Sequence, residues 1–420
     1  MKNLNYTHNE RTSTTHILLV TALLLLFLPG LAPPLMGEAF DWGVTLDNFT
    51  TINYSGGDDT ALSQRNKAAV WAETRWVSEN NNRFILSGQG SFLYTNEPLY
   101  LFDIDRLVLR ARFPGLLGEA TVADASFGRF RFMEPTGLVM NHPADGVSFM
   151  SDHGEVRWGF SLGYTGLLLK PEAGIEMSSE DTADKTDEGV YFAPRRLLQI
   201  GELTFPRLPG RQSLTVAAVA QQDLRGLFDD DTADDFHSLH GLLSLSGPIP
   251  VTPGVYYNLD AGLSYDISDM DNMEKQLAFM GRGRLRYFNE GWGYSRFALG
   301  LLFTSEDFFA VSTPSLAVVH APALDNLLRV TFDYSARPWG NRMAPALRNL
   351  MFTTAGRLFF TPLDSSGDDA AGAGYQGAEI EAGISVRPAV DLGFAMKGGV
   401  FIPQEGDING LLRFELSVSF

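Results

Sequence analysis

The last nine residues, Leu412-Arg413-Phe414-Glu415-Leu416-Ser417-Val418-Ser419-Phe420, alternate apolar and polar side chains up to a terminal aromatic ring. Because successive side chains of a strand point to opposite faces, this strand has one apolar face and one polar, partly charged face. A soluble sandwich buries such an apolar face against a second sheet, whereas a membrane barrel turns it toward lipid. The same alternation recurs along most of the chain, so the fold depends on what the apolar faces meet.

The N-terminus has the layout of a cleavable signal peptide. Lys2 and Arg11 precede an apolar run over residues 17–28, and Gly37 and Ala39 form a small-x-small cleavage site. The run of about 12 residues is shorter than the ~20 that a spanning helix needs, which disfavours the alternative of a membrane-anchoring helix. We therefore expect a signal peptide at 1–39 and a single domain at 40–420.

Composition narrows the class of protein further. After the leader no helix-length apolar segment remains, so membrane insertion has to use strands that close into a barrel. The chain has no cysteine, which excludes a lipid-anchor cysteine and a disulfide framework. The net charge of −18 argues against nucleic acid as a partner, and no Walker-type loop or dinucleotide fingerprint occurs. We expect no cofactor and no metal.

The alternation predicts an all-β, antiparallel up-and-down transmembrane barrel of about 18 strands, with 16 and 20 left open. Three regions are weak: 145–151 is short, 195–205 alternates poorly, and 305–348 could hold a further pair of strands. An even number of strands places both termini on the periplasmic side. The predicted strands are 42–54, 66–78, 83–94, 100–112, 118–131, 145–151, 155–167, 195–205, 211–222, 237–247, 254–266, 276–288, 293–304, 325–336, 349–361, 377–387, 390–402 and 409–420.

Connection lengths alternate in the way that barrels require. Periplasmic connections such as Asn80–Asn82 are short, with 337–348 as an exception, and the outward ones are longer and acidic, as at 178–190 and 229–235. We expect these acidic runs to be solvated loops, with divalent-cation bridging to anionic lipid as the alternative. Aromatic residues cluster at strand ends, which favours two interfacial girdles.

Charged side chains within the strands share a face. An arginine near the bilayer midplane would cost about 2–4 kcal/mol on the lipid side, so these faces must line the lumen. The predicted lining residues are Arg106, Arg110, Arg112, Arg129, Arg131, Arg282, Arg284, Arg286, Arg329, Asp333, Glu379, Glu381, Arg387, Asp391, Lys397, Arg413 and Glu415.

Two interpretations of these charges remain. The charges can border an aqueous channel, or they can form a salt-bridged plug in a filled structural or adhesive barrel. Barrels of 16–18 strands leave a channel, which favours a pore for small hydrophilic solutes. Because lumen charges lie between low-dielectric walls, the arginines should outweigh Glu379, Glu381 and Glu415 and select anions such as small carboxylates or acidic sugars.

Segment 129–146 stands apart because its middle is apolar. Arg129 and Arg131 lead into a Pro/Gly-bounded connection that contains Leu138, Val139 and Met140. Apolar residues are unusual in a connection that stays in water. The segment therefore either folds into the barrel and narrows it or packs on neighbouring loops.

The leader, the strand series and the terminal strand ending in Phe420 resemble Gram-negative outer-membrane barrels. The run Gly128 to Arg131, followed by Asp145-Gly146 before a strand, resembles a stretch of the 18-stranded substrate-specific porins. The resemblance implies a location in the bacterial outer membrane among its lipids, and recognition of the strand ending at Phe420 by the barrel-assembly machinery.

A barrel hydrolase is the competing class. His237 and His240 follow the acidic run 229–235 at a predicted outward strand start, where a rim Asp/His pair would sit. No Gly-x-Ser-x-Gly motif occurs, and known barrel enzymes are smaller. We therefore expect a protein that is not an enzyme.

Overall fold

The computed structural model describes residues 39–56, 59–95, 100–175, 177–187, 189–227, 236–268, 277–312, 314–339, 345–362 and 374–420. The predicted signal peptide, apart from Ala39, and the acidic run 229–235 lie outside these residues. Within the described part of the chain, no helix has both the length and the apolar character needed to cross a membrane.

The described residues form one antiparallel sheet of 18 strands. Short helices occur only in its connections: α3 (Ser179–Thr186), α4 (Pro345–Arg348) and the 3-10 turns η1 (Lys170–Glu172), η2 (Pro209–Arg211) and η3 (Arg225–Leu227). The strands are β1 (Ala39–Ser55), β2 (Asp59–Val77), β3 (Arg83–Thr95), β4 (Tyr100–Pro114), β5 (Val122–Met133), β6 (Asn141–Asp152), β7 (Arg157–Tyr164), β8 (Arg196–Leu208), β9 (Gln212–Asp223), β10 (Ser238–Pro248), β11 (Val255–Asp266), β12 (Leu277–Asn289), β13 (Ser295–Thr304), β14 (Leu328–Ala336), β15 (Met351–Thr361), β16 (Gly374–Ala389), β17 (Leu392–Pro403) and β18 (Asn409–Ser419).

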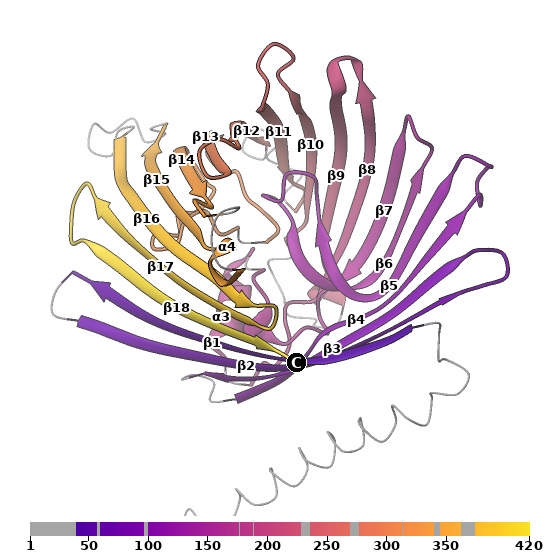
Figure 1. The fold of residues 1–420 in the computed structure, drawn as a ribbon, viewed down its shortest axis with the longest axis horizontal. Helices are drawn as coiled ribbons and strands as arrows, with labels where there is room; N and C mark the ends of the chain where they lie inside the picture. Colours follow the sequence, from indigo (N-terminus) through magenta and orange to yellow (C-terminus); the bar gives the residue numbers. More distant parts are fainter. Residues whose placement is uncertain are drawn as a thin grey trace, which may run out of the picture.

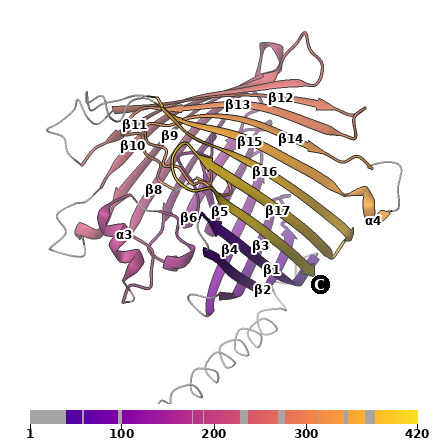
Figure 2. The ribbon, with the colours of Figure 1, turned by 90° about the vertical axis from the view of Figure 1, so that its left-hand side faces the viewer.

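The sheet closes on itself. Each strand pairs with the next one along the chain, and β18 pairs with β1 to complete the wall (Figures 1 and 2). The chain end takes part in this closure, because the Phe420 N–H donates to the Val44 carbonyl at 2.9 Å and the Val44 N–H donates to the Phe420 carbonyl at 3.1 Å. Closure leaves no sheet edge whose backbone groups would face lipid without partners.

The predicted all-β barrel of 18 strands is confirmed, and each predicted strand overlaps one strand of the wall. The weak segments 145–151 and 195–205 correspond to β6 and β8. The further pair considered for 305–348 does not occur among its described residues, where the only strand is β14 and α4 follows it.

The two ends of the barrel differ. One end, here called the turn end, holds both ends of the described chain and short connections such as Ser78–Asn82, between β2 and β3, and the two residues between β16 and β17. The opposite loop end holds the long connections between β7 and β8, β9 and β10, and β13 and β14. The exception predicted at 337–348 is present, since the connection from β14 to β15 is long and lies at the turn end.

The outer face of the wall is apolar. On β12, Leu277, Phe279, Leu285 and Tyr287 are exposed and alternate with residues of the inner face. Large aromatic side chains are also exposed near the strand ends, with Trp42 at 66% and Trp292 at 69%. An apolar band with aromatic residues at its margins is the surface that a bilayer solvates.

Candidate functional site

The tip of the β5–β6 hairpin, residues 134–140, crosses the interior of the barrel. β5 and β12 lie on well-separated parts of the wall, with β6 to β11 between them. Even so, the Arg282 guanidinium of β12 donates to the Thr136 carbonyl at 3.0 Å. A hairpin tip can reach a strand so far along the wall only by passing through the lumen.

The connection from β13 to β14, residues 305–327, enters the lumen from the other side and meets this tip. The backbone N–H groups of Val311 and Ser312 donate to the Val139 carbonyl at 2.8 and 3.0 Å. The Asn141 N–H donates to Ser312 Oγ at 2.8 Å. The two inner loops are therefore joined by two backbone–backbone hydrogen bonds and by one bond to the Ser312 hydroxyl.

The junction of the two loops forms the apolar core of the molecule together with buried residues of the wall. The sequence left open whether the apolar middle of segment 129–146 folds into the barrel or packs on neighbouring loops. It does both, because it folds inward and packs there on the second loop. The buried members contributed by the loops are Leu138, Val139, Met140, Phe308, Val311, Leu316, Leu324 and Leu327.

A buried carboxylate stabilises the first loop. Glu134 is fully buried and accepts hydrogen bonds from the backbone N–H groups of Leu138 and Val139 at 2.7 and 2.9 Å. It also accepts from the Thr136 N–H and hydroxyl. Donors aimed at an ionised carboxylate satisfy its charge without a cation, so Glu134 holds the tip in one conformation.

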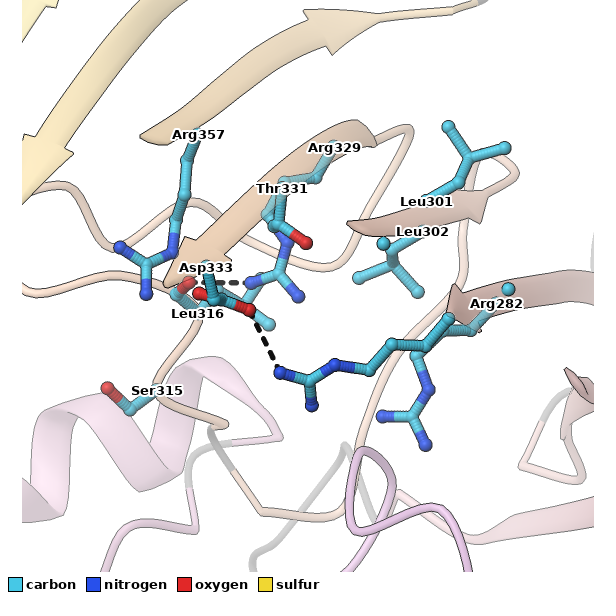
Figure 3. Close-up of a pocket in the computed structure, with 12 residues that line it drawn as sticks. Arg282, Leu301, Leu302, Ser315, Leu316, Arg329, Thr331, Asp333 and Arg357 are labelled. Atoms are coloured by element: carbon cyan, nitrogen blue, oxygen red, sulfur yellow. Dashed lines mark hydrogen bonds and ion pairs between the residues drawn. The ribbon is translucent and has the colours of Figure 1, made fainter. Parts of the chain in front are cut away.

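The central feature of the lumen is a cavity bordered by arginines, here called the arginine cavity. It has a volume of about 200 Å³ and is lined by Arg282 and Arg284 of β12, Arg329 of β14 and Arg357 of β15, with Asp333 of β14 among them. Figure 3 shows Arg282, Arg329, Arg357 and Asp333 around this space, with Leu316 and Ser315 of the second loop at its margin.

Carboxylates compensate only part of this positive charge. Arg282 pairs with Asp260 at 2.6 Å, Arg284 pairs with Asp333 at 2.9 Å, and Arg357 pairs with Glu381. Arg329 instead donates to the Leu316 carbonyl at 2.6 Å. Within the described residues, Arg329 forms no ion pair, and neither does Arg286, which lines a wider cavity that shares Arg282 and Arg284 with this one. The local charge is therefore positive.

A second basic group lies on the opposite part of the wall, on β4 and β5. A cavity of about 390 Å³ is lined by Arg106, Arg110, Arg129 and Arg131 together with Lys67. Arg129 is neutralised by Asp145 at 2.9 Å and Asp103 at 3.2 Å, and Arg131 donates to the Asn141 side chain at 2.6 Å. Among the described residues, no carboxylate lies within ion-pair distance of Arg106 or Arg110.

A β-bulge places an extra carboxylate, that of Asp105, beside this second group. Gln89 of β3 pairs with Arg106 of β4, but the next residue, Gly90, pairs with Ile104, so Asp105 is left over. The Asp105 carboxylate then accepts from Lys67 at 2.8 Å while Arg106 lines the same cavity. Strict alternation does not predict this arrangement, since it places neighbouring residues on opposite faces.

The remaining predicted lining residues lie on the wall between its middle, where Lys397 pairs in register with Arg413, and the turn end, where Arg112 and Arg387 lie. Arg112 pairs with Asp124 at 2.7 Å, Lys397 lies 3.4 Å from Glu415, and Arg413 donates to Thr51 at 3.4 Å. Arg387, Lys397 and Glu415 border one cavity of about 570 Å³.

Two predicted residues occupy unexpected positions. Asp391 lies in the turn before β17 rather than on a strand, and its backbone carbonyl accepts from Ser419. Glu379 is fully buried, and loop N–H groups occupy both of its oxygens.

Besides residues of the second basic group such as Lys67 and Asp105, sequence reasoning missed three residues around the arginine cavity and the first inner loop. Arg357 lies on the inner face of β15 with Ala355. The alternation of segment 349–361 could have predicted this position. Asp260 of β11 carried the same signal, since it alternates with the exposed Leu259 and Leu263. Glu134 gave no comparable signal, because its partners lie within a non-repetitive loop.

A buried ion cluster fixes a further loop-end segment. Arg196 of β8 donates to Asp181 of α3 at 2.6 Å and lies 3.1 Å from Asp223 of β9, and all three side chains are fully buried. Arg225 joins the cluster at 2.8 Å from Asp181. The expectation that the 178–190 run is a simple solvated loop is therefore wrong for Asp181, which ties α3 to the wall.

The residues considered for catalysis do not assemble a catalytic centre among the described residues. His240 is buried with its Nε2 atom 3.2 Å from the Phe309 carbonyl, and His237 Nδ1 accepts from the Asp223 N–H at 3.1 Å. Across the ranges that the structure describes, no group of three or more His, Cys, Asp or Glu side chains could hold a metal ion.

Comparison with known proteins places the fold. No protein-family model matches the chain, and no curated protein matches it in sequence. Solved structures from Pseudomonas aeruginosa do match: OccK11 (OpdR) at 14% identity and a TM-score of 0.61, over 92% of this chain and 97% of that one. OpdO matches at 13% identity and a TM-score of 0.62, over 92% and 98%. OccK2 (OpdF) in complex with glucuronate matches at 11% identity and a TM-score of 0.61, over 92% and 99%. The likeness is one of architecture, and this chain therefore has the 18-stranded fold of the Pseudomonas OccK and Opd outer-membrane porins.

Proposed function

We propose that the chain is an outer-membrane channel through which small hydrophilic anions, such as small carboxylates or acidic sugars, diffuse passively. The observation that carries this proposal is the arginine cavity beside the junction of the two inner loops. A solute that crosses the lumen there passes guanidinium groups that its own carboxylate can bind bidentately.

Electrostatics favours anions at this position. The chain as a whole carries −18, but screening limits the reach of exposed charges to about 8–10 Å at physiological salt. Arg286 and Arg329 lie between low-dielectric walls without a carboxylate partner among the described residues, and such walls focus the field of a charge. The local positive charge therefore decides selectivity.

The OccK2 (OpdF) structure holds glucuronate, an acidic sugar, which supports this class of solute for a chain of the same fold. The proposal includes export by the signal peptide at 1–39, cleavage near Ala39, and recognition of Phe420 by the barrel-assembly machinery. It also includes the absence of enzymatic activity.

A filled structural or adhesive barrel is the second candidate. The apolar junction of the inner loops, with Met140, Phe308 and Val311 fully or almost fully buried, is the observation that favours it. In that case the arginines would serve only to hold the loops to the wall, as Arg282 and Arg329 do through the Thr136 and Leu316 carbonyls.

Conductance separates the two candidates. Refolded protein in a planar bilayer should give discrete current steps, and glucuronate should reduce the chloride current by competing for the arginine cavity. Liposomes that contain the protein should swell in glucuronate faster than in a neutral sugar of the same size. Folded protein that passes no current and excludes both sugars would establish the filled barrel.

A further inference from the structure

Both carboxylate oxygens of Glu379, on β16, accept hydrogen bonds from the second inner loop. Its Oε1 atom accepts from the Val318 and Val319 N–H groups at 2.8 and 3.0 Å, and its Oε2 atom accepts from the His320 N–H at 2.8 Å. The side chain is fully buried, and no described basic side chain forms an ion pair with it. Three successive backbone donors therefore take the place of a cation.

Aromatic rings hold the same segment from a second direction. The His320 ring stacks on Phe401 of β17 with centroids 4.1 Å apart and rings 6° from parallel. It also meets the edge of Phe359 of β15 at 5.0 Å. The Val318 N–H also lies 3.1 Å from Glu381 Oε1, so residues 318–320 are held on the wall chiefly by Glu379, with a shared contact to Glu381, and by two buried rings.

The opposite flank of this segment borders the arginine cavity. Ser315 and Leu316 line it, and the Leu316 carbonyl accepts from Arg329 (Figure 3). Only a few residues separate this flank from Val318, so the position of 315–316 depends on where 318–320 is seated.

We propose that Glu379 is a positioning residue that sets the width of the solute pathway by seating residues 318–320 on the wall. In this proposal the Glu379 carboxylate is buried and hydrogen-bonded to the three N–H groups, so it does not attract or repel ions that pass through the lumen. The proposal rests on the proposed channel function, because the width is measured through conductance.

The variant Glu379→Gln tests the proposal. The amide oxygen can still accept from Val318 and Val319, but the amide nitrogen is a donor and faces the His320 N–H, which is also a donor. Residues 318–320 should detach from the wall. Single-channel recordings should then show more current flicker and conductance levels higher than those of the wild type. Reversal potential should stay close to the wild type, because no solvent-accessible charge is lost.

Glu381→Gln is the matched control. Glu381 lies two residues away on the same strand and pairs with Arg357 beside the cavity. It also accepts from the Val318 N–H at 3.1 Å, and the amide oxygen of Gln can keep that bond. Its loss should shift the reversal potential further toward anions without added flicker. A width effect confined to position 379 and a charge effect confined to position 381 would separate positioning from electrostatics.

A disulfide that fixes residue 319 to β17 should restore wild-type conductance in Glu379→Gln. It would not do so if Glu379 acted only through its charge. A Cβ atom added at Gly399 of β17 would lie 2.8 Å from Val319 Cγ2, so Val319→Cys with Gly399→Cys brings two thiols within bonding reach. The natural chain has no cysteine to interfere. In the Glu379→Gln background, the oxidised tether should restore wild-type traces and a reductant should remove the effect.

The outcomes are distinct. A wild type that does not conduct would refute the proposed function. A conducting wild type with an indistinguishable Glu379→Gln variant, or a variant that the oxidised tether leaves unchanged, would overturn the positioning role. If Glu379→Gln does not fold, Glu379→Asp, which retains the charge on a shorter side chain, takes its place in the same comparison.

Discussion

Single residues in the lumen divide into those that face water and those that hold the loops. Arg286 lines a wide cavity toward the turn end and forms no ion pair with a described residue. Glu379 and Glu134 are fully buried and bind backbone N–H groups. All three are charged residues of the barrel interior, yet only the first can act on a solute directly.

Replacing Arg282, Arg284 and Arg286 together with Ser should shift the reversal potential toward cations. The change removes three positive charges and leaves Asp260 and Asp333 without their partners, so the local field reverses. The measurement is the reversal potential under a KCl gradient. The triple change of Arg75, Arg83 and Arg112 to Ser is the control, since it removes the same charge at the turn end. Equal shifts in both variants would exclude a special role for the arginine cavity.

Acidification should unseat the second inner loop through His320. Burial lowers the pKa of His320 below its ordinary value of 6.5, against the opposing attraction of Glu379. The seated loop therefore favours the neutral ring, and a released loop takes up a proton more readily. The stabilisation is complete above about pH 6.5 and is lost as the pH falls below it. Flicker in single-channel traces should rise over that range.

His320→Phe is the control for this prediction, because it retains an aromatic ring to stack on Phe401 but cannot titrate. Its traces should be independent of pH through the same window. Glu379 is the other titratable group against this ring, and a pH dependence that persists in His320→Phe would belong to Glu379 instead.

At the scale of elements, the sequence predicted the wall and not the loops. Strand identity depends on alternation within about ten residues, so β12 and β18 could be read from local sequence. The bulge at Asp105 was not predicted, because it breaks that alternation. The contact between Val139 and Val311 escaped because it joins two non-repetitive segments far apart in the chain. The predicted lining residues came from the wall, but alternation did not indicate that Glu379, Arg282 and Arg329 would bind backbone groups of the inner loops.

The buried ion cluster should control how firmly α3 is attached. Arg196→Met would leave Asp181 and Asp223 buried without that partner, which should cost about 3–5 kcal/mol of local stability. Trypsin should then cleave after Lys185 much faster than in the wild type. Glu180→Gln, at the partly exposed margin of the cluster, should change the rate little, with an effect under ~1 kcal/mol. Similar rates in all three proteins would mean that α3 is held by other contacts.

At the scale of the whole molecule, the last residue takes part in closing the wall. Deleting Phe420 removes the two hydrogen bonds with Val44 and an aromatic ring that is 74% exposed on the outside. The yield of folded barrel should fall several-fold, as measured by the fraction that keeps its compact gel mobility without heating. Phe420→Tyr retains the backbone and an interfacial ring and should assemble normally. Normal assembly of the deletion would show that β18 closes without its terminal residue.

The hydrogen bonds between Val139 and residues 311–312 also impose an order of events in time. The two loops start from distant parts of the wall, so they are brought together only when the strands between them have paired. We therefore expect a newly inserted barrel to pass through an interval in which these strands have paired and the two inner loops have not yet joined. During that interval it would admit molecules that the mature protein excludes, and a cell that makes it rapidly would be transiently leaky to compounds of that size.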